Sequence, residues 1–263
     1  MNERFETLAL SRPADHVLQV TLNRPPANAL NTQMGKDLLT LWQALYVDAY
    51  DVRCVLLTGA GEKCFCAGGD LKERNGMTDA QWQQQHALFE QMIQAMTLCP
   101  IPILAAVNGA AFGGGTEIAC AADFIYASDT ARFALTEVTL GIMPGCMGTQ
   151  NLPRAVGVRR AKEIILTGAP FDATEAASWG LVNRVAALGG LLDAALSTAV
   201  RIANNAPIAT RQAKKAMHVA SQIDSHHGYL YEIEAYNRMV VTEDRLEGVA
   251  AFNEKRPPKF QGR

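Results

Sequence analysis

The 263-residue chain has no apolar run that approaches the roughly 18 residues needed for a membrane-spanning helix. Residues 1–10 carry Glu3, Arg4 and Glu6 where a secretory signal would have an apolar stretch. We therefore expect no membrane partner and a cytoplasmic location.

Charge of either sign is scarce, and the two signs nearly balance. Charged residues make up 19% of the chain and hydrophobic residues 49%, which is typical of a globular protein. The 24 Lys and Arg against 26 Asp and Glu give a net charge of −2, with no strongly basic block. Nucleic-acid binders usually carry a basic surface, so no nucleic-acid partner is expected.

Paired cysteine spacing is also missing. The six cysteines lie mostly within apolar runs, and none forms the C-x-x-C pattern of zinc sites and redox motifs. Cys64 and Cys66 have no nearby residues that would complete a metal site. We therefore expect buried free thiols in a reducing compartment, and no metal.

What the chain does contain is an alternation of strand and helix patterns. Residues 17–22 (VLQVTL) predict a half-buried strand, and residues 52–58 and 103–107 predict buried strands. Residues 78–98 predict a long helix that ends before Pro100. A short alanine-rich helix after residues 113–115 and a strand over 124–127 complete the alternation, which favours an α/β fold.

Helical patterns dominate after Gly168. Asp172 is a predicted N-cap, and two later helices carry apolar stripes, formed by Leu192, Leu196, Ala199 and Ala203 and by Tyr229, Ile233, Tyr236 and Val240. We predict an α/β core over residues 1–190 and a helical region over residues 191–263.

Two glycine-rich segments, residues 67–70 (AGGD) and 108–117 (NGAAFGGGTE), each join a predicted strand to a predicted helix. Neither has the G-x-G-x-x-G spacing of a dinucleotide site or the Gly-Lys-Ser/Thr of a phosphate-binding loop, and no G-x-S-x-G nucleophile elbow occurs. Such turns bring backbone N–H groups close to a ligand. Two converging turns would place two donors on one carbonyl oxygen, although tight packing alone also explains a single turn.

Two glutamates follow this pattern. Glu117 comes directly after the second turn, and Glu137 ends the apolar segment RFALTE over residues 132–137. Taken singly, each is explained as an acid at the start of a helix, with Thr136 capping the second. Near the donors of the glycine turns, the same carboxylates would serve acid–base chemistry.

In their order and spacing, these segments resemble the crotonase, or enoyl-CoA hydratase/isomerase, superfamily over nearly the whole chain. The segments that carry the resemblance are residues 23–25 (NRP), 29–31 (ALN), 65–71 (FCAGGDL), 108–109 (NG), 113–117 (GGGTE), 140–145 (LGIMPG), 166–168 (LTG), 179–183 (WGLVN), 247–248 (EG) and 252–257 (FNEKRP). The resemblance implies a crotonase-like spiral of ββα units, followed by C-terminal helices that build a homotrimer or a dimer of trimers.

The resemblance also implies the chemistry. An acyl-CoA is the implied substrate, and no separate cofactor is needed because coenzyme A is part of it. Glu117 and Glu137 become the catalytic pair, and the backbone N–H groups of Ala67 and Gly114 become the oxyanion hole. By the same likeness, CoA and substrate contacts fall on Arg24, Ala27, Ala29, Gly68, Gly69, Asp70 and Leu71, with Phe252 and Lys255 reaching a neighbouring subunit's CoA.

The expected reaction is syn addition of water across an α,β double bond, or the reverse dehydration. We expect Glu117 to orient water as the base and Glu137 to supply the proton at the α-carbon. Because both carboxyls would share one apolar pocket, they should titrate as a coupled pair.

Alternatives remain for the substrate of a hydratase and for the function itself. Residues 71–74 (LKER) and the C-terminal segment resemble methylglutaconyl-CoA hydratases of leucine breakdown, and carnitinyl-CoA dehydratases are also similar. A charged acyl group would need a cationic partner, which the sequence does not single out. Cys146, Met147 and Asn151 depart from the residues common in relatives, and Met147 is expected to reshape the acyl pocket. An isomerase is a second alternative, and RNA binding a third, although the helix over residues 32–46 has Lys36 as its single lysine.

Overall fold

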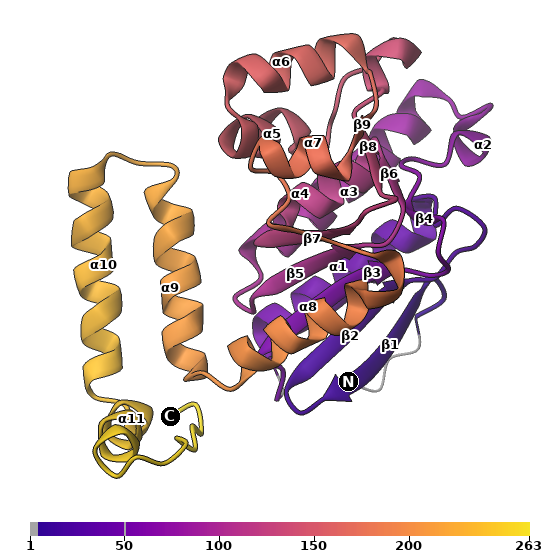
Figure 1. Ribbon diagram of the computed structural model, residues 1–263. Helices are drawn as coiled ribbons and strands as arrows, with labels where there is room; N and C mark the ends of the chain where they lie inside the picture. The colour runs from indigo at the N-terminus through magenta and orange to yellow at the C-terminus, as the bar shows by residue number, and fades with distance from the viewer. Residues whose placement is uncertain (1–4, 50) are drawn as a thin grey trace.

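A computed structural model describes residues 5–49 and 51–263 of the protein. Two sheets organise the fold (Figure 1). The larger has the order β1 (Leu8–Ala14), β2 (Val17–Leu22), β3 (Cys54–Gly59), β5 (Ile103–Val107), β7 (Phe124–Ser128) and β10 (Arg184–Ala186). The smaller has the order β4 (Cys64–Cys66), β6 (Ala110–Phe112), β8 (Arg132–Ala134) and β9 (Phe171–Asp172). The pairs β1–β2 and β8–β9 are antiparallel and the other pairs are parallel, so successive chain segments step from one sheet to the other.

The helices begin where the sequence supplies capping residues. Asn31 caps α1 (Thr32–Val47) by accepting from the Met34 N–H, and Thr78 with Gln81 forms a capping box at α3 (Asp79–Leu98). The remaining helices are α2 (Leu71–Arg74), α4 (Gly114–Ala121), η1 (Glu137–Leu140), α5 (Gly148–Val156), α6 (Val158–Thr167), α7 (Ala173–Ser178), α8 (Leu188–Ala203), α9 (Pro207–Ala220), α10 (Ser225–Val240) and α11 (Glu243–Asn253). None of the helices within the described ranges is both long enough and apolar enough to cross a membrane.

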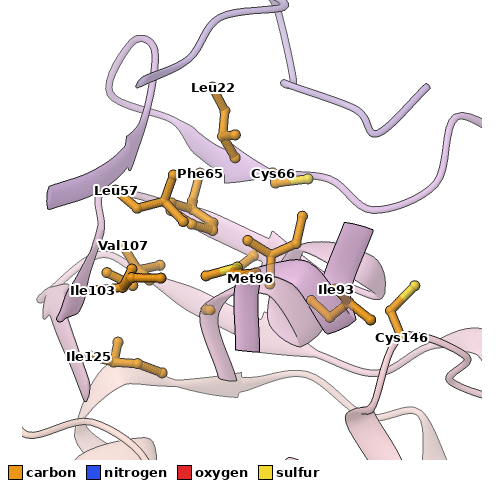
Figure 2. Packing of buried hydrophobic residues seen from close by; sticks show 14 of the residues in the cluster. Leu22, Leu57, Phe65, Cys66, Ile93, Met96, Ile103, Val107, Ile125 and Cys146 are labelled. Carbon is orange, nitrogen blue, oxygen red and sulfur yellow. The ribbon is translucent and has the colours of Figure 1, made fainter. Parts of the chain in front are cut away.

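The core lies on both faces of the larger sheet. Every residue of β3 and β5 is buried, and alternate residues of these strands point to opposite faces. One set, including Leu57 and Ile103, packs with α1 and α3; the other, including Leu56 and Leu104, packs under α8. Figure 2 shows part of the first cluster, with Phe65 and Met96 among its labelled side chains.

The last helices differ from the rest in their packing. α8 buries Leu191, Ala195, Ala199 and Ala203 against the larger sheet, so the predicted stripe is right at its last two positions and one residue off at its first two. α9 and α10 form a hairpin that stands away from the sheets (Figure 1). α11 lies at the open end of this hairpin, opposite the turn that joins α9 to α10. α8 packs on the core, whereas α9–α11 do not. The boundary at residue 190 between the α/β core and the helical region stays a prediction.

Most expected elements are present. The strand over residues 17–22 and the helix over residues 78–98 match β2 and α3, with Thr78 as the cap. Asp172 caps α7 as predicted, in a capping box with Glu175. All six cysteines are free, which confirms the expectation of unpaired thiols. The Thr136 side chain makes no capping hydrogen bond to η1, so that part of the expectation is wrong.

Candidate active site

The first glycine-rich turn connects β4 to α2. Gly68 has φ +87°, a left-handed conformation that favours glycine, and its carbonyl accepts the Leu30 N–H at 2.8 Å. The Asp70 side chain caps α2 by accepting from the N–H groups of Lys72 and Glu73, at 2.9 and 3.2 Å. The turn is therefore fixed from both sides by short hydrogen bonds.

The second turn connects β6 to α4. Gly113 has φ +50°, and a Cβ at this position would lie 3.1 Å from Glu137 Oε1, so a side chain would crowd that carboxylate. The Gly113 N–H donates to the Ala134 carbonyl at 2.8 Å, and Thr116 Oγ1 donates to the same oxygen at 2.9 Å. These contacts fix the start of α4 against β8.

The two turns meet at their glycines. A Cβ built on Gly114 would lie 3.9 Å from both the Gly68 Cα and the Gly69 N, and one built on Gly68 would lie 3.3 Å from the Gly114 N. In the described part of the chain, the N–H groups of Gly69 and Gly114 have no hydrogen-bond acceptor. Two unpaired amide donors from different turns therefore lie side by side.

Ala67 was expected to supply the first of these donors, and the structure contradicts this expectation. The Ala67 N–H donates to the Ala27 carbonyl at 3.0 Å, so it is already paired. Gly69, two residues further along the turn, has the unpaired amide instead. The sequence locates the turn, but it does not predict which amide of the turn forms a hydrogen bond within the protein.

Glu117 projects from the first turn of α4 and is 2% exposed. Its Oε1 accepts two backbone hydrogen bonds, from Cys146 N–H at 2.7 Å and Gly148 N–H at 2.9 Å. Burial raises the pKa of Glu117 to about 7; the neighbouring Glu137 charge adds to the rise, and the backbone donors oppose it. Near neutral pH this carboxyl therefore exists in both protonation states.

Glu137 begins η1, three residues after the end of β8 at Ala134, and is 9% exposed. Its Oε2 is buried and has no hydrogen-bond partner among the described residues. Burial raises the pKa of Glu137 as well. An unpaired buried carboxyl oxygen is costly, which makes this atom one that a ligand or water would satisfy.

Both carboxyls and both unpaired amides line one cavity of about 470 Å³. Its other walls are formed by Leu30, Ala67, Gly68, Leu71, Arg74, Trp82, His86, Phe89, Gly113, Thr136, Leu140, Ile142, Met143, Pro144, Gly145 and Cys146. The cavity thus combines apolar walls with two proton-transfer groups and two neighbouring unpaired donors, a set suited to stabilising a developing oxyanion while protons move. Among the described residues no cluster of His, Cys, Asp or Glu is arranged to hold a metal ion.

The residues expected to bind CoA are not all brought together. Gly68, Gly69 and Leu71 line the cavity, whereas Arg24, Ala27, Ala29 and Asp70 do not. Arg24 forms an ion pair with Asp70 at 2.6 Å and donates to the Ala29 carbonyl at 3.1 Å. These groups brace the turn, and their contact with CoA stays a prediction.

Phe252 and Lys255 lie at the end of α11 and just beyond it, and neither lines the cavity of its own chain. Phe252 is 83% exposed. Their expected role at a neighbouring subunit's CoA therefore stays a prediction.

Other cavity residues were not anticipated as site residues. Trp82 and Phe89 lie on α3, and sequence periodicity does not distinguish a helix face toward the core from a face toward a cavity. Arg74, His86 and the residues from Ile142 to Cys146 were not predicted as site residues, although Arg74 and residues 142–145 belong to segments that carry the family resemblance. Met147 was expected to reshape the acyl pocket, but it is not a lining residue; its sulfur lies 3.7 Å from Thr97 Oγ1. Cys146 lines the cavity in its place.

Comparisons with known proteins point to one family. The family model described as enoyl-CoA hydratase/isomerase matches residues 13–263. The (E)-benzylidenesuccinyl-CoA hydratase of Thauera aromatica is 40% identical over 95% of this chain and 97% of its own. The short-chain-enoyl-CoA hydratase of Clostridium acetobutylicum is 41% identical over 94% of each chain. A crystal structure of enoyl-CoA hydratase from Bacillus anthracis superposes with a TM-score of 0.96 at 43% identity, over 98% of this chain and 100% of that one.

The match of the family model spans nearly the whole chain, and these relatives agree with it in sequence and in fold. The two sheets and the helices of the chain form the crotonase fold that the sequence motifs predicted. The chain belongs to the enoyl-CoA hydratase/isomerase family of the crotonase superfamily.

Proposed function

We propose that the protein is a hydro-lyase that adds water syn across the α,β double bond of an acyl-CoA thioester, or removes it in the reverse direction. The observation that carries this proposal is the placement of Glu117, Glu137 and the unpaired amides of Gly69 and Gly114 on one cavity. Relatives named as enoyl-CoA hydratases at about 40% identity support it.

In the proposed mechanism, the thioester oxygen accepts hydrogen bonds from the N–H groups of Gly69 and Gly114. Attack of water at the β-carbon pushes electrons onto that oxygen as an enolate forms, and the two preorganised donors stabilise the charge. Loss of one such donor typically costs about 2.7–4 kcal/mol. Gly69 replaces Ala67 in this role because the Ala67 amide is paired with the Ala27 carbonyl.

The two glutamates divide the proton transfers. Glu117 has Oε1 fixed by two backbone donors, so its other oxygen accepts the proton of the attacking water. Glu137, which lines the cavity and whose Oε2 has no hydrogen-bond partner among the described residues, delivers the proton to the α-carbon. In dehydration both transfers run backwards. Burial supports this division because it raises the pKa of both carboxyls toward the range in which they exchange protons at neutral pH.

We further propose that the protein works in the cytoplasm as a homotrimer or a dimer of trimers, with CoA as part of the substrate. The predicted stripe of α10 supports the assembly, since Tyr229, Ile233, Tyr236 and Val240 are all exposed in the single chain. Arg24, Phe252 and Lys255 are the proposed CoA contacts, the last two across a subunit boundary. Light scattering in solution tests the assembly, and a monomer contradicts it.

The reaction is tested by a panel of thioesters: crotonyl-CoA, methylglutaconyl-CoA, crotonobetainyl-CoA and a 3-enoyl-CoA. We expect hydration of at least one of the first three, with ¹⁸O from labelled water appearing in the 3-hydroxyacyl product. Equal inactivity on all three overturns the proposal. Turnover of the 3-enoyl-CoA without hydration of any other favours the isomerase alternative.

The oxyanion hole is tested at Gly114, the first residue of α4. Proline is tolerated at a first helical position and removes the N–H, whereas alanine keeps it, and a Cβ at this site meets no atom closer than 3.5 Å. We expect Gly114→Pro to lower kcat by about 10²–10³-fold and Gly114→Ala to change it far less. Equal losses in the two variants would show that the amide is not used.

A further inference from the structure

Arg74, the last residue of α2, lines the cavity that holds both glutamates. Its guanidinium carbon lies 4.3 Å from the centroid of the Trp82 ring and 5.7 Å from that of Phe89. The Arg74 Nε donates to Gln85 Oε1 at 2.8 Å. Two aromatic rings and one amide therefore hold the guanidinium in a defined place.

The carboxylate of the adjacent Glu73 accepts its hydrogen bonds from groups other than Arg74. Glu73 Oε2 accepts from the Thr32 N–H at 2.9 Å and from Gln85 Nε2 at 2.8 Å. Over residues 5–49 and 51–263, no Asp or Glu forms an ion pair with Arg74, and its two Nη atoms have no hydrogen-bond acceptor. Gln85 thus orients Arg74 and leaves its terminal donors unused.

These donors lie beside the proposed oxyanion hole. Arg74 Nη1 is 3.3 Å, and Nη2 3.7 Å, from the point where a Cβ on Gly69 would stand. Burial lowers the pKa of Arg74, yet a guanidinium stays charged at any physiological pH. The charge of Glu73 offsets part of the cost of burying this cation, but Glu73 forms no ion pair with it, and a bound anion would relieve the rest.

The cavity also limits which anion can enter. The ionised Glu117 that accepts the proton of water repels a negative ligand, so an anion is accepted only where a fixed cation offsets this charge. A guanidinium offers two parallel N–H donors that match the two oxygens of a carboxylate. Because Arg74 shares its cavity with the reacting groups, the carboxylate it meets belongs to the acyl part of the substrate.

We propose that Arg74 selects substrates whose acyl group carries a second, free carboxylate, which its Nη atoms bind. The inference rests on the proposed function and narrows its substrate class. Arg74 supplies the cationic partner for a charged acyl group that the sequence did not single out.

The test compares glutaconyl-CoA with crotonyl-CoA, which differ by one carboxylate on the same four-carbon enoyl unit. We expect the wild-type protein to show the higher kcat/KM for glutaconyl-CoA. Arg74→Gln should lower the ratio of the two kcat/KM values at least about tenfold, the size of one lost charged hydrogen bond. Arg74→Lys keeps the charge without the paired donors and should lower the ratio less.

Arg160 provides the matched control variant. Its guanidinium lies 4.5 Å from the Trp179 ring centroid and pairs with Glu163 on the outer surface, away from the cavity. Arg160→Gln should leave the ratio of the two kcat/KM values unchanged. A second probe needs no variant: the primary amide of glutaconyl-CoA has the same shape without the charge, and the wild-type protein should hydrate it less well than glutaconyl-CoA.

The outcomes distinguish a failure of the Arg74 inference from a failure of the proposed hydratase function. If crotonyl-CoA is hydrated as well as glutaconyl-CoA, or if Arg74→Gln slows both equally, the inference is overturned while the hydratase proposal stands. Equal rates for the acid and its amide overturn it too, whether or not the variants fold. If neither these thioesters nor methylglutaconyl-CoA and crotonobetainyl-CoA are hydrated, the proposed function itself fails.

Discussion

Glu117 and Glu137 line the same cavity, but the chain holds them in opposite ways. Glu117 lies in a regular helix, and two backbone N–H groups from the loop over residues 145–148 fix its Oε1. Glu137 lies at the first position of a short 3-10 helix, and its Oε2 is buried with no partner in the described part of the chain. One carboxylate is anchored, and the other is left with an unmet hydrogen bond.

This difference indicates how proton transfer is divided. An anchored carboxylate presents its remaining oxygen in one direction, which suits the positioning of a water molecule for attack. A carboxyl with an unpaired oxygen exchanges a proton with the substrate without first breaking a protein hydrogen bond. The predictions below separate the two roles, beginning with the largest expected effect.

Replacing either carboxyl group by an amide should abolish most hydration. We expect Glu117→Gln and Glu137→Gln each to lower kcat for an active thioester by about 10²–10⁴-fold, the usual contribution of acid–base catalysis. The variants should differ in deuterium exchange at the α-carbon of butyryl-CoA in D₂O, measured by NMR. Exchange should survive in Glu117→Gln and disappear in Glu137→Gln, because Glu137 serves the α-carbon.

Glu163→Gln is the control for these variants, because Glu163 is an exposed residue paired with Arg160. Equal loss of exchange in the two active-site variants would contradict the division of roles. Isomerisation of a 3-enoyl-CoA by Glu117→Gln, with no hydration by the wild-type protein, would favour the isomerase alternative.

The anchor of Glu117 can be disturbed without touching either carboxylate. A Cβ on Gly148 would lie 2.8 Å from Glu117 Oε1 and 3.0 Å from its Cγ, so Gly148→Ala must displace the side chain or the loop. We expect kcat for hydration to fall by up to about 100-fold, since misplacing a reacting group by about 1 Å has this effect. Exchange at the α-carbon should be retained.

Gly189→Ala is the matched control, because a Cβ there meets no atom within 4 Å. If Gly148→Ala leaves hydration intact, the backbone anchor of Glu117 does not matter for the reaction.

The sequence predicted the fold and the site to different depths. Periodicity and caps located β2, α3 and the start of α7, because these signals depend on neighbouring residues. The short ordered motifs indicated the crotonase fold and both glutamates. The pairing of the Ala67 amide and the unpaired guanidinium of Arg74 were not predictable, because each depends on segments far away in the chain.

The pH dependence of hydration is the smallest expected effect, and it tests whether the charge of Glu137 affects the pKa of Glu117. Burial raises the pKa of Glu117 to about 7, and the charge of Glu137 adds to this rise. Since Glu117 must be ionised to accept a proton from water, kcat/KM for hydration should fall about tenfold per pH unit below about 7. In Glu137→Gln the like charge is gone, so the residual activity should keep its plateau to lower pH. An inflection near the usual glutamate value of 4.5 in the wild-type protein would contradict the raised pKa, and an unshifted inflection in Glu137→Gln would show that the carboxyls titrate independently.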